Sequence, residues 1–154
     1  MKKLFLIATV TFLTAATFAQ SDKYVASMKA NIAAIDSSFK NPANLLDLAN
    51  KFERIATAEK TQWLAYYYAA LCQVNYTYME QDKSKIDAIA DKATELIDKA
   101  DALQPNNSEI SCLKSMIASA HMMVNPMQRF QEYGPEAASY IEAAMKQDPA
   151  NPRP

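Results

Sequence analysis

The chain has 154 residues, with 16 Lys and Arg against 17 Asp and Glu and a formal net charge of −1. This balance excludes the strongly basic surface that nucleic-acid binding requires. A single glycine and seven prolines leave little material for tight hairpins, and strand-like alternation is absent. We therefore predict an all-α protein.

Residues 1–19, MKKLFLIATVTFLTAATFA, carry two lysines, an apolar stretch interrupted by threonines, and small residues at Thr17 and Ala19. This pattern is typical of a bacterial secretory signal peptide, with cleavage after Ala19. No later segment approaches the roughly 18 apolar residues that a membrane span needs. We expect one domain over residues 20–154, in the periplasm or secreted.

Apolar residues at a 3.6-residue period predict the first three helices. In the first, the apolar face recurs from Tyr24 to Phe39 at intervals of four, four, three and four. The second covers about residues 42–58. The third covers about residues 62–79 and is predicted to begin at a Thr61 cap.

The same period predicts three more helices. The fourth covers about residues 84–103, and the fifth begins at Asn107 or Ser108 and ends before Pro126. Pro135 is predicted to occupy the first turn of the sixth. The short connections favour antiparallel hairpins, either in a closed bundle or in a stacked array.

A repeat decides between these architectures. The pattern A-x3-I-x2-A-x4-P occurs twice at an offset of 44 residues, first at Ala93, Ile97, Ala100 and Pro105, and then at Ala137, Ile141, Ala144 and Pro149. The pattern resembles the second helix of a tetratricopeptide repeat, and the resemblance to that family extends over residues 61–149. The usual unit of that family has about 34 residues, so each unit here is about ten residues longer. The resemblance implies a short right-handed α-solenoid of about three hairpins.

The resemblance also implies a function. First helices of such hairpins line a concave groove, and the eight positions carried onto this sequence are Gln62, Ala69, Gln73, Tyr76, Glu109, Met116, Ser119 and Met123. The chain has no phosphate-binding glycine loop and no CxxC motif. We therefore expect a non-catalytic, cofactor-free interaction module that binds a peptide or partner protein.

A soft-metal site is the alternative function, because residues 118–136 hold the only histidine and three of the eight methionines. Successive side chains of a helix turn by about 100°. His121, Met122 and Met123 therefore point in three directions, and we predict a histidine at the surface rather than a metal ligand. Copper binding by these side chains remains the alternative.

The segment VNPMQRFQEYGP is interpreted as a long connection inside the last hairpin. Arg129 and Tyr133 could form a recognition loop there. In the other interpretation, Phe130 and Tyr133 fold back and cover the end of the hairpin.

Two further predictions follow from the helix register. Cys72 and Cys112 are staggered by roughly 10 Å along parallel helices, which exceeds the reach of a disulfide, so we predict two free thiols. The last helix lacks a polar outer face. We therefore expect either a further hairpin beyond it or self-association through residues 135–149.

Overall fold

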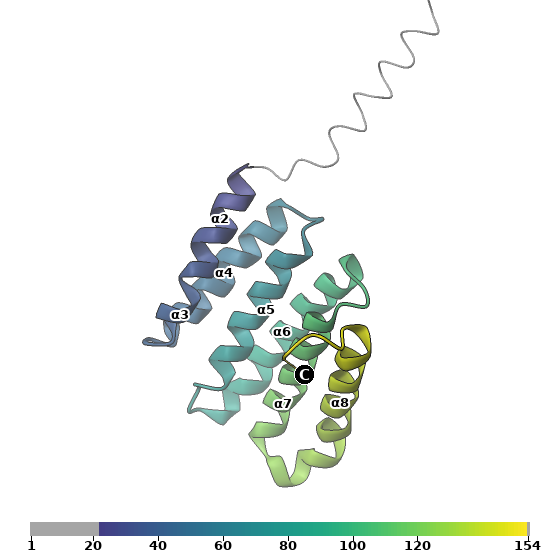
Figure 1. The fold of residues 1–154 in the computed structure, drawn as a ribbon. Coiled ribbons are helices and arrows are strands. Elements are labelled where there is room, and N and C mark those ends of the chain that lie inside the picture. The colour runs from purple at the N-terminus through teal and green to yellow at the C-terminus, as the bar shows by residue number, and fades with distance from the viewer. Residues whose placement is uncertain (1–21, 154) are drawn as a thin grey trace, which may run out of the picture.

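The computed structural model describes residues 22–153, and every regular element in that range is a helix. The predicted signal peptide lies outside the described residues. Within them, no helix is long and apolar enough to cross a membrane. The helices, shown in Figure 1, are α2 (Asp22–Ala33), α3 (Ile35–Ser38), α4 (Ala43–Ala58), α5 (Trp63–Thr77), α6 (Lys83–Leu103), α7 (Ser108–Val124) and α8 (Pro126–Gln147).

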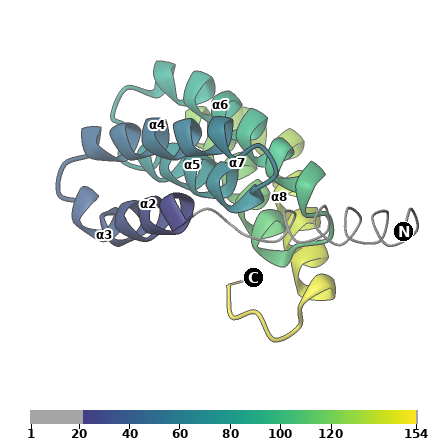
Figure 2. The same ribbon diagram turned by 90° about the horizontal axis from the view of Figure 1, so that it is seen from above.

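From α4 onward the helices pack in chain order. Each is in contact with the next, and α5 also contacts α7 directly. Seen from above, α4 and α6 lie along one side of α5 and α7 (Figure 2). This confirms the all-α class, while the right-handed tetratricopeptide geometry stays a prediction.

The 44-residue repeat corresponds to equivalent positions in α6 and α8. Ala93 and Ala100 are fully buried in α6, and Ala144 is fully buried in α8. Alanine at these positions lets neighbouring helices approach closely because no larger side chain separates their backbones.

The structure extends this repeat to α4. Ala49 and Ala56 precede the alanines of α6 by the same 44 residues, and both are buried. The intervening position is Glu53 instead of isoleucine, and it forms an ion pair with Lys92 of α6 at 2.8 Å. The missing isoleucine concealed this unit in the sequence.

The prediction of one continuous helix over residues 24–39 was wrong. The chain breaks at Ala34 into α2 and α3. The hydroxyls of Ser37 and Ser38 both donate to the Ala34 carbonyl, at 2.9 and 2.8 Å. Such side-chain bonds to a helix carbonyl bend helices. Phe39 consequently lies 42% exposed, outside the expected apolar face.

Two helix starts test the predicted caps. The cap of α5 is Gln62 and not Thr61, and its side chain makes no capping bond. The prediction for α7 is confirmed, because the Asn107 side chain accepts hydrogen bonds from the backbone of Glu109 and Ile110 at 3.0 and 3.3 Å.

The last helix differs most from its prediction. α8 begins at Pro126, with the Asn125 side chain as its cap, and Pro135 lies in its interior. The predicted connection over residues 124–135 is therefore helical from Pro126. Proline fits a first turn because its φ is fixed and no N–H is needed there. The exposed surface of α8 at Pro135 leaves water access to the carbonyl that loses its partner.

The outer side of α8 is largely unburied. Ala144 is the one buried side chain of this helix, and Met127, Phe130 and Met145 are exposed. Self-association through residues 135–149 therefore stays a prediction.

Candidate functional site: a groove between α5 and α7

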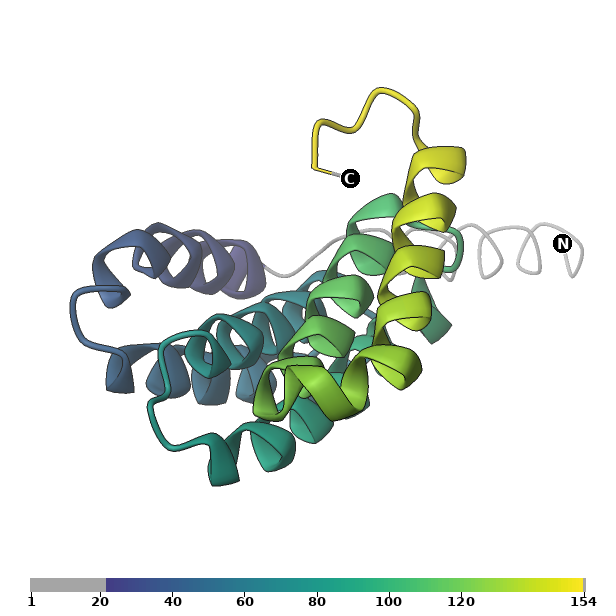
Figure 3. The same cartoon turned by 90° about the horizontal axis from the view of Figure 1, so that it is seen from below.

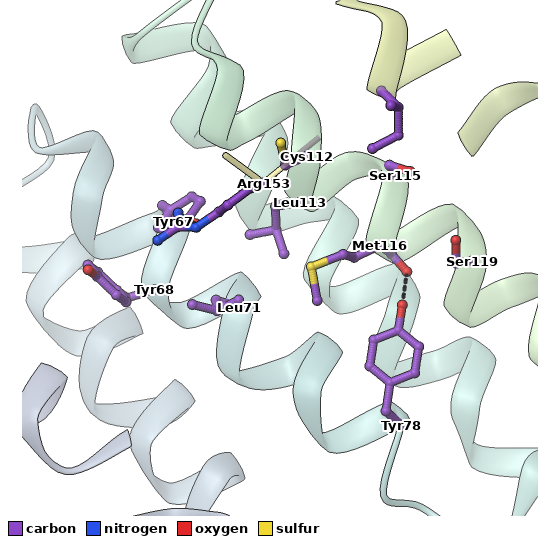
Figure 4. A pocket seen from close by; sticks show the side chains of 11 residues that line it. Tyr67, Tyr68, Leu71, Tyr78, Cys112, Leu113, Ser115, Met116, Ser119 and Arg153 are labelled. Carbon is purple, nitrogen blue, oxygen red and sulfur yellow. Dashed lines mark hydrogen bonds between the residues drawn. The ribbon is translucent and has the colours of Figure 1, made fainter. Parts of the chain in front are cut away.

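A groove of about 440 Å³ lies between α5 and α7 (Figure 4). This volume is within the range of about 300–1,000 Å³ that small-molecule sites occupy. We call it the tyrosine groove. Its lining side chains are Tyr67, Tyr68, Leu71, Tyr78, Cys112, Leu113, Ser115, Met116, Ser119, Ile141 and Arg153.

The wall from α5 follows from the spacing of its side chains. Tyr67, Leu71 and Tyr78 recur at intervals of four and seven, which places them along one side of the helix. Tyr68 is held between two rings: it stacks on Phe52 with centroids 5.4 Å apart and meets Tyr67 edge to face at 5.3 Å. These contacts fix the aromatic wall before any ligand arrives.

The opposite wall comes from α7. Cys112, Ser115, Met116 and Ser119 recur at three- and four-residue intervals and line the groove, and Figure 4 shows Met116 pointing toward the α5 side chains. The Tyr78 hydroxyl donates to the Met116 carbonyl at 2.8 Å and ties the end of α5 to the middle of α7. Burial raises the pKa of the Tyr78 phenol, which therefore stays a neutral donor near neutral pH.

One end of the groove carries charge. Residues 148–153 turn back from the end of α8, a course seen from below in Figure 3. Arg153 forms an ion pair with Glu109 and lies 3.5 Å from the Tyr67 hydroxyl. Glu109 also accepts from that hydroxyl at 3.2 Å and from the Asn151 side chain at 3.0 Å. Burial is the main cause of the raised pKa of Tyr67, and Arg153 opposes it.

The groove residues expected from the sequence are only partly brought together. Met116 and Ser119 line the groove, and Glu109 belongs to the charged end. Ala69 and Gln73 are buried at 0% and 8% exposure. Neither of these two side chains is part of the groove lining, so the structure does not place them at this site as expected.

Three further expected positions lie elsewhere. The Tyr76 hydroxyl donates to Glu80 at 2.7 Å, Gln62 lies beside α2 in a separate hollow, and Met123 is half-buried outside the lining. The residues that α5 contributes to this groove are Tyr67, Tyr68, Leu71 and Tyr78 instead.

The prediction that His121 lies at the surface was wrong. His121 is only 8% exposed, because α6 and α8 cover it. Its Nδ1 lies 2.9 Å from Asp87, and its Nε2 lies 3.6 Å from Asp91. A helical wheel of α7 alone could not show this, since both carboxylates come from α6.

Arg129 and Tyr133 do not form a loop, because both lie in α8. Arg129 donates to both carboxylate oxygens of Asp87, at 2.6 and 2.8 Å, and to the His121 carbonyl at 3.1 Å. The Tyr133 ring stacks on His121. The Arg129 guanidinium, followed by His121, holds the pKa of the Asp87 carboxyl down at about 2. We call Asp87, His121, Arg129 and Tyr133 the α6–α8 cluster.

The two cysteines are free, as predicted, and both are buried. Cys72 is completely enclosed, and burial raises the pKa of its thiol to about 12. Cys112 lines the groove, and burial raises its pKa as well.

Among residues 22–153, no group of three or more His, Cys, Asp and Glu side chains could hold a metal ion. The methionine-based copper alternative stays a prediction.

Comparison with known proteins gives one informative similarity. No family model matches the chain. No curated protein matches it either. A solved structure, the HusA haemophore from Porphyromonas gingivalis, is 38% identical in sequence and superposes with a TM-score of 0.77. The match covers 88% of this chain and 66% of that one, so this chain resembles a haemophore over about two thirds of that protein's length.

Proposed function

We propose that this protein is an exported carrier that binds haem in the tyrosine groove and catalyses no reaction. The observation that carries the proposal is the structural neighbour, a haemophore at 38% identity. The predicted signal peptide supports export, and a haem carrier outside the cytoplasm has to bind its cargo and release it unchanged.

The chemistry of the groove fits a flat and mostly apolar ligand. Tyr67, Leu71 and Met116 offer aromatic and thioether surface from two facing helices. Aromatic side chains favour stacked or edge contacts with another ring system. Most of the lining surface is apolar, and hydroxyl groups and the Arg153 guanidinium supply the polar atoms, which matches the general pattern of small-molecule sites.

The single histidine lies outside this groove, in the α6–α8 cluster. Imidazole is a common axial ligand of haem iron. We therefore expect binding to depend on the groove and to survive the loss of His121. His121→Gln is the matched variant, because glutamine keeps a side-chain amide that can donate to Asp87.

Titration of the purified chain with haem tests the proposal. Binding is followed by the haem absorption spectrum and by quenching of the only tryptophan, Trp63, which packs 5.8 Å from the Tyr67 ring. Ser119→Phe fills the groove and is expected to weaken binding by about tenfold, a difference of about 1.4 kcal/mol. Ser139→Phe, on the exposed side of α8, is the control and should bind like the natural chain.

The outcomes separate the function from the site. Absence of haem binding by the natural chain would contradict the function. Equal weakening by Ser119→Phe and Ser139→Phe would contradict the groove assignment while leaving the function standing.

A peptide or partner protein in the same groove is the second candidate. It is favoured by Met116 and Ser119, which the tetratricopeptide resemblance assigned to the groove and which do line it. Flexible methionine surfaces suit varied partners. A partner recovered from the cell envelope and displaced by haem would place both ligands at the same site.

A further inference from the structure

The lining of the tyrosine groove contains one charged side chain, Arg153. Every other lining residue is uncharged. Any ligand in the groove therefore meets an apolar surface over most of its area and a positive charge at one end. This arrangement is asymmetric and would orient a ligand that has an apolar body and an acidic edge.

Arg153 is not fully used by its present contacts. Its ion pair with Glu109 and its contact with Tyr67 both involve Nη1. A guanidinium has five N–H donors, so Nε and Nη2 supply three more. The side chain is 61% exposed, and these donors can therefore reach a ligand at the mouth of the groove.

Glu109 does not depend on Arg153 alone. The Tyr67 hydroxyl and the Asn151 side chain donate to it at 3.2 and 3.0 Å. These neutral donors keep the Glu109 carboxylate hydrogen-bonded when Arg153 turns toward a ligand. The movement of Arg153 therefore leaves no half-buried carboxylate without a hydrogen-bond partner, a loss that would otherwise oppose it.

We propose that Arg153 recognises an ionised carboxylate of the ligand, so that the groove selects porphyrins with free propionates over their esters. The proposal rests on the haem-binding function above. Arginine binds a carboxylate through two parallel N–H···O bonds, one to each charged oxygen. An ester cannot reproduce this geometry, because it is neutral and its alkylated oxygen is a poor hydrogen-bond acceptor. The apolar body of the porphyrin then lies along Leu71 and Met116.

The experiment compares haem with haem dimethyl ester in the same detergent-containing buffer. The natural chain is expected to bind haem about fivefold to tenfold more tightly than the ester, the size of one partly exposed charged hydrogen bond. Arg153→Gln should weaken haem binding by that factor and leave ester binding unchanged. Arg153→Lys should recover part of the preference, because it keeps the charge without the two-point geometry.

Lys99→Gln is the matched control. It removes one positive charge from an exposed side chain of α6 that lines no described pocket, and it should bind both ligands like the natural chain. Circular dichroism confirms that each variant is folded.

Four results would overturn the proposal. Equal weakening of haem and ester by Arg153→Gln would make Arg153 structural, and no change with either ligand would make it irrelevant. If the natural chain binds neither ligand, the proposed function fails, and the inference fails with it. Ester binding without a haem preference would refute the role of Arg153 alone.

Discussion

The imidazole of His121 stacks on the ring of Tyr133, with centroids 5.1 Å apart and planes inclined by 15°. The two residues come from α7 and α8, and the Arg129 side chain beside them reaches Asp87 of α6. One small cluster therefore joins three consecutive helices. It lies on a different side of α7 from the tyrosine groove, so its expected role is to hold α8 in place.

Tyr133→Ala is expected to destabilise the protein by about 1–2 kcal/mol, because it removes both the stacking on His121 and the apolar contact of the ring. Tyr133→Phe keeps the ring and should change the free energy of unfolding by less than about 0.5 kcal/mol. Urea unfolding followed by circular dichroism measures both. Equal losses for the two variants would show that the hydroxyl, and not the ring, is what matters.

Asp87 should make stability depend on pH. Its pKa is lowered from 3.8 to about 2 in the folded chain, first by Arg129 and then by His121. A lowered pKa stabilises the fold above the unfolded value near 4, and this contribution is lost as the pH falls from about 4 to about 2. Because the carboxylate is 38% exposed, we expect about 1 kcal/mol at neutral pH.

Asp87→Asn tests this in unfolding experiments at pH 7 and at pH 2. The variant should be less stable than the natural chain at pH 7, and the gap should close at pH 2. Asp98→Asn is the comparison, since Asp101 also binds Lys114 and can keep it paired. A gap for Asp87→Asn that is constant over this range would contradict the electrostatic explanation.

The only glycine of the chain, Gly134, lies inside α8 under the Phe130 ring. A Cβ at this position would lie 3.2 Å from two carbons of that ring. Alanine gains about 1 kcal/mol over glycine in a helix interior. Phe130 is 63% exposed and can shift, so we expect Gly134→Ala to stabilise the protein by about half of that amount.

The paired measurement uses Phe130→Ala as the background. Without the ring, Gly134→Ala should give the full gain of about 1 kcal/mol. A loss of stability in that background would mean that the backbone, rather than the ring, requires glycine here. Thermal unfolding of the natural chain, the two single variants and the double variant gives the coupling between the two positions.

The two thiols should differ in reactivity. Cys72 is fully enclosed with a pKa of about 12, so it should resist alkylation in the folded state. Cys112 lies 8% exposed in the groove and should react slowly. Haem should slow Cys112 alkylation further, by about tenfold at saturating concentration, and leave Cys72 unchanged. Mass spectrometry of the labelled peptides reads each site, and Cys112 labelling that ignores haem would argue against groove binding.

The sequence by itself determined the helical class and most helix boundaries. The 3.6-residue period defines α4, α5, α6 and α7 within one or two residues, because one side of each helix must be buried. Asn107 likewise predicts the start of α7, because its side chain accepts a hydrogen bond from the backbone of Glu109, only two residues away. The free thiols followed from the rise per residue and from the assumed parallel alignment of α5 and α7.

The tertiary structure decided the start of α8 and the composition of the site. Pro135 is compatible with a first turn or with an exposed helix interior, and only the cap at Asn125 and the packing of α8 on α7 select the second. His121 is buried because α6 and α8 supply its partners, which no reading of α7 could reveal. The groove also depends on tertiary packing, because α4, α6 and α7 determine which side chains of α5 stay uncovered. Each residue turns the helix by about 100°, so an error of one or two residues in the expected register exchanges Ala69 and Gln73 for Tyr67 and Tyr68 in the groove.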